Sequence, residues 1–389
     1  MSNAPLPRWL SDLAARFPLG TEHRINHDGF AGKVCGYYQR DDGKSGVCLQ
    51  LNSAKVVHVY GERWLEPDAV SPSKMENPMF TAAVRPDSAT TLTKKNLDAP
   101  AFVVTGRSSL ALQDDITIAG TLFPAGTAIT LPAGEHRPGS DFGIFVDGNA
   151  LIALPDTRDT NAAVPGPLEN GLVQIGGFHF APGGNATARS GGDDIPAINP
   201  FSIWDLSFRP ACPDPRGMFA IVLPDGSRSW IDIYKLGVDH LKDGTSRCGV
   251  TIADGESLPV RIGGNGKVAR LDFPTAQEIL GHHGKQLLTY DEFRVAAFGV
   301  TEKTAAGKDP KVTGLDAPRT SRFGMMQATC SLWDWGTDGD PDNPRASIFG
   351  GYWWNGDNAG SRYAPLDSWP GDSAGGISAR GRCDHLTPA

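Results

Sequence analysis

Three aspartates alternate along one segment, as the first ligands of a calcium-binding loop do. Asp338, Asp340 and Asp342 occupy positions one, three and five of that pattern. An EF-hand loop also needs glycine at position six and a bidentate glutamate at position twelve, whereas Asn343 and Phe349 stand there. We therefore expect no cofactor. A structural Ca²⁺ site of another type stays open, and the alternative is that the segment is simply an exposed acidic loop.

A glycine-rich segment near the C-terminus imitates the nucleophile motif of serine hydrolases. Residues 371–375 read Gly-Asp-Ser-Ala-Gly, with Ser373 in the nucleophile position. A serine nucleophile also needs a histidine base, an orienting carboxylate and an oxyanion hole in one pocket. Too little chain follows Ser373 to build a specificity pocket, so we expect no hydrolase.

Cysteines are too sparse for a disulfide framework. The chain of 389 residues has six, at Cys35, Cys48, Cys212, Cys248, Cys330 and Cys383. At this density most are expected to be reduced and buried. A pairing of Cys330 with Cys383 stays open, because both stand beside the tryptophan-rich segments described below.

Composition restricts the classes of fold and partner. With 47 glycines and 30 prolines, and with short β-branched runs, the chain is predicted to be mostly β with few helices. A net charge of -8 argues against nucleic acid as a partner, because phosphate binding needs clustered Lys and Arg. No apolar stretch is long enough to insert in a membrane, and the N-terminus lacks the apolar core of a signal peptide.

The N-terminal residues predict a helix followed by a small antiparallel barrel. Apolar residues recur every three or four positions over 6–17, which is typical of an amphipathic helix. Strands are expected at 33–40, 46–51 and 55–60, separated by turn residues. We assign residues 1–67 to an attachment module.

The middle of the chain predicts a second β domain, a prism or sandwich, over residues 68–170. It opens with a polar linker at 66–95, and its expected strands lie at 101–105, 116–118, 127–131, 142–146 and 151–154. Residues 165–199 are rich in glycine, and we expect them to be a largely irregular connector packed onto the last domain.

The last domain, residues 171–389, is predicted to open with a hairpin over 218–234 and to contain two helices. The first helix spans 274–281, followed by His282 and His283, which lack metal-ligand spacing and mark a helix end. The second begins with the capping-box pair Thr289 and Glu292.

Three segments then follow in a fixed order. They are Trp-x-Trp at 333–335, Gly-Gly-x-Trp at 350–353, and an Arg-Cys segment at 382–383. The residues after Trp353 lack the apolar periodicity of a helix or strand. That run is predicted to be a display surface.

This order of elements resembles the C-type lectin fold of the formylglycine-generating-enzyme type over about residues 200–389. A closer resemblance is to the variable proteins of diversity-generating retroelements. Those proteins carry Gly-Ser-Arg, matched at 360–362, and a tail of the form Ala-Arg-Gly-x-Cys-Asp-His-Leu, matched at 379–386. Together the two resemblances indicate an α+β, mostly β protein with a C-type lectin-like C-terminal domain.

The resemblance implies a receptor-binding protein of a phage or prophage tail, diversified over about residues 333–386. Its expected partners are a cell-surface protein or glycan, and other tail proteins through the N-terminal module. We expect a homotrimer located in the virion, and in the host cytoplasm before assembly, without a signal peptide. The chemistry expected is recognition, and the protein is expected not to be an enzyme.

Within that region the tryptophans Trp333, Trp335 and Trp353 are expected to be buried anchors. Gly350, Gly351, Gly356 and Gly360 are expected to fix the backbone path. The exposed binding face is predicted to combine aromatic contact area with adaptable polar groups, as in antibody paratopes. It consists of Ser347, Tyr352, Trp354, Asn355, Asp357, Asn358, Tyr363, Asp367, Ser368 and Trp369.

Two alternatives accompany this interpretation. A formylglycine-generating oxidase of the same fold uses a pair of cysteines after the Gly-Gly-x-Trp segment, but residues 350–382 contain none. Cys383 alone does not supply the pair, so the fold is expected without that chemistry. A cytoplasmic bacterial variable protein, with a ligand unrelated to infection, stays open.

Overall fold

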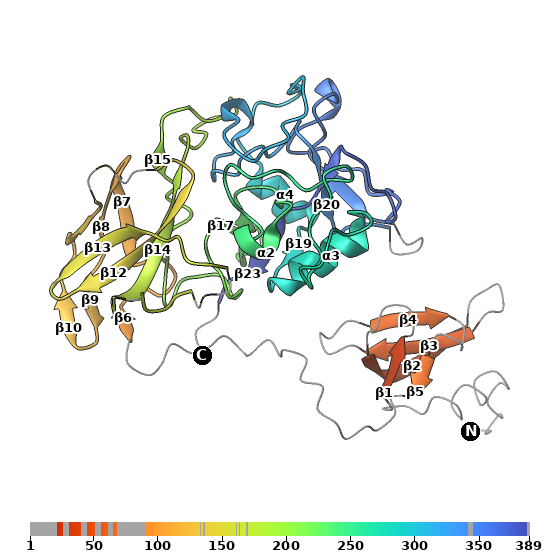
Figure 1. Cartoon of the computed structure of the whole chain (residues 1–389), viewed down its shortest axis with the longest axis horizontal. Helices are drawn as coiled ribbons and strands as arrows, with labels where there is room; N and C mark the ends of the chain where they lie inside the picture. Colours follow the sequence, from red (N-terminus) through yellow and green to blue (C-terminus); the bar gives the residue numbers. More distant parts are fainter. Residues whose placement is uncertain are drawn as a thin grey trace. The chain divides into compact units, whose positions relative to one another are not determined.

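The computed structural model describes the strands between residues 22 and 67, and residues 91–386 except 133, 135–136, 161, 163, 169 and 341–344. The chain divides into two compact units, Met1–Met79 and Phe80–Ala389. The helix predicted at 6–17 lies outside the described residues. Strands greatly exceed helices in the described part, as the composition predicted (Figure 1).

The first unit contains a five-stranded antiparallel sheet with the order β4-β3-β2-β1-β5. Its strands are β1 (Glu22–Ile25), β2 (Ala31–Gln39), β3 (Ser45–Gln50), β4 (Val56–Tyr60) and β5 (Leu65–Pro67). β2, β3 and β4 lie where the sequence predicted them, and β1 and β5 complete the small β module. The predicted turns at 41–44 and 52–53 fall outside the described residues.

The second unit begins with two sheets that share one core. The larger sheet has the order β15-β14-β12-β13-β11-β8-β7, with β16 also paired to β14, and the smaller has the order β10-β9-β6. Their strands are β6 (Leu92–Lys94), β7 (Phe102–Gly106), β8 (Ser109–Leu112), β9 (Ile116–Ile118), β10 (Thr121–Phe123), β11 (Ala128–Thr130), β12 (Ser140–Asp147), β13 (Ala150–Pro155), β14 (Val173–Ala181), β15 (Ala197–Ile198) and β16 (Trp204–Asp205). Phe102, Phe142 and Phe178 of the larger sheet and Ile116 of the smaller pack in this core, which is the arrangement of a sandwich.

Most of residues 165–199 is irregular, as predicted, but the prediction missed one strand in the first half of the segment. Strand β14 runs through it and pairs along β12, so the sheet of the middle region continues beyond the boundary predicted at residue 170. Gly176 and Gly177 belong to this strand because bulkier residues do not fit. A Cβ at Gly177 would lie 2.6 Å from the Phe142 carbonyl oxygen and 2.7 Å from the Trp204 ring. Here glycine marks close packing instead of a loop.

The later part of that segment packs onto the last region, as predicted. The backbone N–H of Gly191 donates to the Gly299 carbonyl at 3.0 Å, and that of Gly192 to the Ala317 carbonyl at 2.8 Å. Residues near 191 therefore connect the two parts of the second unit.

The last region holds two small sheets and short helices. One sheet has the order β17-β18-β23-β19 and the other the order β21-β20-β22. The elements are β17 (Met218–Val222), β18 (Arg228–Asp232), α2 (His240–Asp243), α3 (Phe273–His282), β19 (Gln286–Leu287), α4 (Tyr290–Ala296), η2 (Ala317–Arg319), β20 (Trp333–Gly336), β21 (Ser347–Phe349), η3 (Gly356–Asn358), β22 (Ile377–Ser378) and β23 (Gly381–Asp384). Figure 1 shows the last strand, β23, beside β19, which precedes it by almost a hundred residues.

Both predicted helices begin where their end signals stand. The Asp272 side chain accepts a hydrogen bond from the Thr275 N–H at the start of α3, and proline follows inside the first turn. At α4, Thr289 and Glu292 form both hydrogen bonds of the capping box. His282 ends α3 and His283 is its C-cap, as the sequence predicted.

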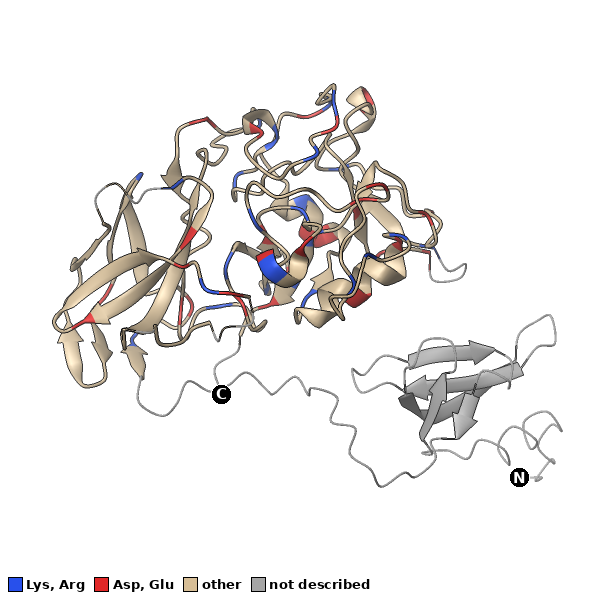
Figure 2. Ribbon diagram, in the orientation of Figure 1, with Lys and Arg blue, Asp and Glu red and all other residues tan. Residues whose placement is uncertain are grey.

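The described residues include no helix with the length and hydropathy needed to cross a membrane. Figure 2 shows basic and acidic residues intermingled along residues 91–386. Such mixing differs from the concentrated basic surface that a phosphate backbone requires.

Candidate binding face

A buried ion pair lies at the base of the face. In strand β20 the side chain of Trp335 is completely buried and that of Trp333 almost completely, as predicted for these two anchors. Asp334 stands between them, and its Oδ1 accepts a hydrogen bond from Lys235 Nζ at 2.7 Å. The same ammonium donates to the Leu332 carbonyl at 3.0 Å. Burial outweighs the attraction of Asp334 and lowers the pKa of Lys235 to about 8.

Arg380 extends this pair into a network. Its Nε lies 3.5 Å from Asp334 Oδ2. The guanidinium also donates to the Ile233 carbonyl at 2.6 Å and the Met326 carbonyl at 3.0 Å. The tail motif of the sequence thus joins three separate backbone segments, because a guanidinium presents several donors in a fixed geometry. The arrangement stiffens the framework below the face.

Glycines set the backbone path directly above this base. Gly350 and Gly351 have φ angles of 92° and 87°, which side chains of L-residues rarely adopt. A Cβ on Gly351 would lie 2.3 Å from the Cβ of Ala359. Gly356 and Gly360 also have positive φ, at 47° and 150°. The expectation that these four glycines fix the path is confirmed.

Residues 301–307 hold in place the loop that follows β21, residues 350–369. Glu302 accepts hydrogen bonds from the Ser361 N–H, at 3.0 Å, and from the Ser361 hydroxyl. The Gly307 N–H donates to the Trp353 carbonyl at 3.1 Å, and the Lys303 N–H to the Ala359 carbonyl at 3.2 Å. The loop therefore has a defined backbone although it contains only one turn of 3-10 helix, η3.

The far end of the loop adds to the edge of β21. Ala346 and Ser368 exchange backbone hydrogen bonds of 2.9 and 3.0 Å, and Ile348 N–H donates to the Pro365 carbonyl at 3.0 Å. These contacts place residues 363–369 beside the sheet that carries the tryptophan anchors.

Most of the predicted contact residues are exposed on this framework. Among the predicted residues, the most exposed aromatic side chains are Trp354, at 75%, Trp369, at 58%, and Tyr363, at 39%. Asp357, Asn358 and Asp367 are exposed beside them. Large aromatic side chains are seldom so exposed in a soluble domain without a partner.

Three predicted residues are only half-buried, because they also support the loop. Asn355 Oδ1 accepts a hydrogen bond from the Tyr352 N–H at 2.7 Å. The Tyr352 ring packs against the core that contains Trp335 and lies 5.1 Å from the Trp353 ring. Ser368 is bound to Ala346 through its backbone. Trp353, expected as a buried anchor, is itself half-buried, so it is an anchor only in part.

Ser347 departs from the prediction, because it is fully buried. It lies in β21 opposite Gly336 of β20, and its hydroxyl accepts a hydrogen bond from the Asp338 N–H at 3.0 Å. Successive side chains of a strand point to opposite sides, and Ser347 points inward. Ser347 is a structural residue of the framework.

Two further residues contribute to the surface that the sequence did not predict. Leu366 is 45% exposed, and the Arg345 guanidinium lies 5.3 Å from the centre of the Trp369 ring, in cation–π range. The pairing of Ala346 with Ser368 places residue 345 opposite residue 369. No local signal reveals this contact, because the two residues meet only through that pairing.

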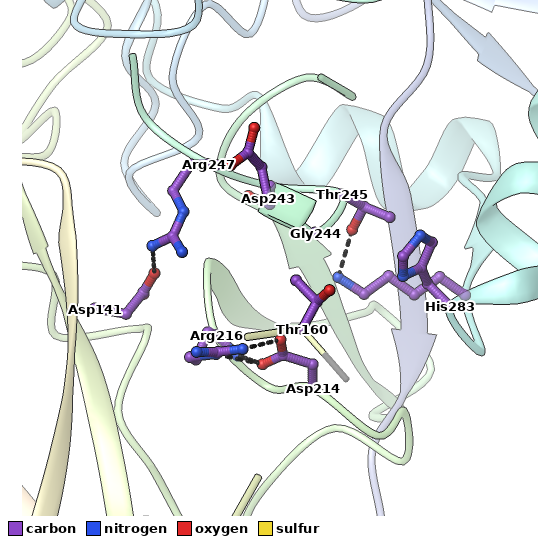
Figure 3. A pocket seen from close by; sticks show the side chains of 11 residues that line it. Asp141, Thr160, Asp214, Arg216, Asp243, Gly244, Thr245, Arg247 and His283 are labelled. Carbon is purple, nitrogen blue, oxygen red and sulfur yellow. Dashed lines mark hydrogen bonds and ion pairs between the residues drawn. The ribbon is translucent and has the colours of Figure 1, made fainter. Parts of the chain in front are cut away.

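A small cavity lies elsewhere in the second unit, between the sandwich and the last region. Its volume of about 30 Å³ suits a water molecule, and Asp141, Arg216, Arg247 and Lys285 help to line it. Figure 3 shows Arg216 beside Asp214, with Nη2 2.7 Å from the carboxylate, and Arg247 facing Asp141. Lys285 Nζ donates to Thr245 Oγ1 at 2.7 Å. None of the predicted face residues lines it.

The acidic motif that resembles a calcium loop contributes to the fold through Asp338. Asp338 Oδ2 accepts a hydrogen bond from the Tyr290 N–H at 2.6 Å and so caps α4, and burial raises the pKa of this carboxyl. Asp342 and Asn343 lie outside the described residues. In the described part of the chain no three His, Cys, Asp or Glu side chains are grouped to hold a metal. The Ca²⁺ prediction stays a prediction.

Neither Ser373 nor the cysteine pair behaves as a reactive group on the face. The Ser373 hydroxyl accepts a hydrogen bond from the Leu271 N–H at 2.9 Å, which fixes the turn. The pairing of Cys330 with Cys383 is wrong: both thiols are free, and Cys383 Sγ instead accepts the Cys212 N–H at 3.0 Å. Cys248 is free as well.

Comparison with known proteins identifies the family. A family model described as the Mtd second domain matches residues 89–205. The tail fiber receptor-binding protein of Bordetella phage BPP-1 is 37% identical over 334 residues, which cover 76% of this chain and 85% of the relative. The M1 variant of the major tropism determinant superposes with a TM-score of 0.68 at 37% identity, covering 77% of this chain and 87% of that chain. The chain belongs to the major tropism determinant family.

A further major tropism determinant structure extends the agreement over most of the chain. The U1 variant covers 94% of this chain and all of its own length, with a TM-score of 0.69 and 31% identity. This likeness supports the C-type lectin-like fold of the last region.

Proposed function

We infer that this chain is a receptor-binding tail protein of a phage or prophage, which determines host tropism by binding a cell-surface target. The observation that carries this function is the pair Trp354 and Trp369, two large aromatic side chains exposed on a backbone fixed from below. The similarity to a tail fiber receptor-binding protein supports it.

The physics of the face favours recognition over other roles. Tryptophan and tyrosine supply broad contact area and lose little conformational freedom on binding, since they have few rotatable bonds. Asp357, Asn358 and Asp367 supply hydrogen-bonding groups around them. Because hydrogen bonds from residues 302–307 already hold the loop, we expect its ordering to add little to the free-energy cost of binding.

We propose that the contact residues are the exposed members of the predicted set together with Leu366 and Arg345. They tolerate substitution because the fold depends on the glycines, Asp334 and Arg380 beneath them. This division between framework and surface suits a region rewritten by a diversity-generating retroelement. A near-copy of the segment beside a reverse-transcriptase gene, differing at adenines, is the genomic observation that tests it.

We further propose that the protein is a homotrimer attached to other tail proteins through its N-terminal module. Several faces then engage one cell surface, and linked sites raise the overall affinity through effective concentration. The target is a cell-surface protein or a glycan. The protein acts in the virion, and it resides in the host cytoplasm before assembly.

The proposed activity is non-covalent and uses neither catalytic residues nor a cofactor. The exposed face offers aromatic, amide and carboxylate groups, which suit contact. Of the thiols in the last region, those of Cys212, Cys330 and Cys383 are buried and that of Cys248 is half-buried, so none of these four is an exposed group of the face.

The test uses cells and single alanine variants. Trp354→Ala and Trp369→Ala should each reduce binding of the labelled protein to susceptible bacteria by about tenfold or more, because central aromatic residues dominate interfaces. Leu122→Ala is the matched control, since Leu122 is 63% exposed on the sandwich, away from the face. Undiminished binding by both tryptophan variants would refute the assignment of the face.

A further inference from the structure

The segment before β17 runs antiparallel to the end of the chain. Pro210 and His385 form a bridge. On either side of it, the Ala211 N–H donates to the Asp384 carbonyl at 2.9 Å, and the Leu386 N–H donates to the Arg209 carbonyl at 2.8 Å. These bonds flank the bridge, so Pro210 and His385 form a pair of the closely spaced, non-hydrogen-bonded kind.

Two residues beyond this bridge, where the chain bends, Cys212 contacts Cys383. The contact is direct, because Cys383 Sγ accepts the backbone N–H of Cys212 at 3.0 Å. The thiol of Cys212 also hydrogen-bonds to that of Cys383.

Both cysteines lie in the core, where the exposed fraction of the residue is 2% for Cys212 and 6% for Cys383. Cys212 Sγ further contacts the Asp214 carbonyl at 3.3 Å and Met218 Sδ at 3.6 Å. The Cys212 thiol donates to Cys383 and lowers the pKa of that group, and the nearby Lys285 ammonium favours the thiolate as well. Cys383 is therefore the better nucleophile of the two.

We propose that Cys212 and Cys383 are a latent disulfide site, which closes when the protein meets a small-molecule disulfide oxidant and fastens β23 to the segment before β17. The Cys383 thiolate attacks the oxidant and releases one thiolate. The Cys212 sulfur then attacks Cys383 in the mixed disulfide and releases the second. The two cysteines lose two protons and two electrons, and the oxidant is reduced to two thiols.

The cross-link closes a long loop around the display region. Cys212 and Cys383 are 171 positions apart, so the loop contains α3, α4, the tryptophan strand β20 and the whole face. Restricting so much of the unfolded chain should stabilise the native state. When the disulfide would form rests on the proposed function. A tail protein folds in a reducing cytoplasm, where its thiols stay free, and works outside the cell, where the disulfide can form.

The test uses the purified full-length chain and requires no receptor, so its outcome is independent of whether the protein binds cells. One sample is treated with oxidised glutathione and another with a phosphine reductant, and both are digested without reduction for mass spectrometry. We expect a peptide in which Cys212 is linked to Cys383, and a melting temperature about 5–10 °C higher in the oxidised sample. Cys248→Ser should keep the shift, and Cys212→Ala should remove it.

The proposal is overturned if Cys212 and Cys383 can both still be alkylated on unfolding after oxidation. It is equally overturned if either is found linked to Cys330 or Cys248 instead. Because the linked peptide is read from the unsubstituted protein, this result stands even if the Cys212→Ala variant folds poorly.

Discussion

The Lys235 ammonium lies 2.7 Å from the Asp334 carboxylate at a place where neither side chain has any exposed surface. Asp334 is the residue between the two anchoring tryptophans of β20, so the pair connects the base of the binding face with the segment after β18. A buried charge loses its hydration and depends on its partner for compensation. The binding face therefore lies above an ion pair in which each buried charge compensates the other.

Removing one member of this pair should destabilise the whole display region. For Lys235→Ala we expect the free energy of unfolding to fall by about 3–5 kcal/mol, because Asp334 stays buried with less compensation. Denaturant unfolding measures this loss. A loss below about 1 kcal/mol in this variant would show that Arg380 alone neutralises the carboxylate.

Substitution of Gly351 should be harmful for two separable reasons. Gly351→Ala introduces a Cβ at a φ of 87° and only 2.3 Å from Ala359, so we expect a loss of about 2–4 kcal/mol in unfolding free energy. Gly226→Ala is the matched control. Gly226 has the same φ of 87° but nothing within 4 Å of the added Cβ, so it should lose only about 1–2 kcal/mol. Equal losses would mean that contact with Ala359 is unimportant.

Glu302 should control the order of the loop more than the stability of the fold. Glu302→Ala leaves the Ser361 N–H and hydroxyl without their acceptor, so amide exchange near residue 361 should accelerate. We expect receptor binding to weaken several-fold while the melting temperature changes by only a few degrees. Unchanged exchange near residue 361 would show that the backbone bonds from Lys303 and Gly307 suffice.

Stability should fall below neutral pH because of two half-buried histidines. Burial and the nearby Lys285 lower the pKa of His283 to about 3, and burial and Arg228 lower that of His385 to about 4, from an ordinary value of 6.5. The folded state therefore binds fewer protons than the unfolded chain. Stability is fully present above pH 6.5 and is lost progressively as the pH falls towards 4.

Urea unfolding at pH 7.5, 6 and 5 measures this dependence, in a range where most carboxylates stay ionised. His283→Asn should flatten the curve, whereas His282→Asn should leave it unchanged, because His282 is exposed at the end of α3. A slope that is the same in both variants would assign the dependence to other groups.

The sequence by itself determined the features that depend on neighbouring residues. Thr289 and Glu292 cap α4 as predicted, because a capping box needs only one helical turn. The hairpin of β17 and β18 and the positive φ values of Gly350 and Gly351 follow from local backbone chemistry in the same way. The family motifs near the C-terminus indicated the lectin-like fold through their order along the chain.

The tertiary structure decided what depends on the meeting of distant segments. Strand β14 was missed because its glycines are required by Trp204, which belongs to another strand. Ser347 is buried and Trp369 exposed according to how β21 pairs with its neighbours. The contact of Cys212 with Cys383 and that of Lys235 with Asp334 join residues 171 and 99 positions apart. A local pattern carries no information on such contacts, because they arise only when the whole domain sets the register of its strands.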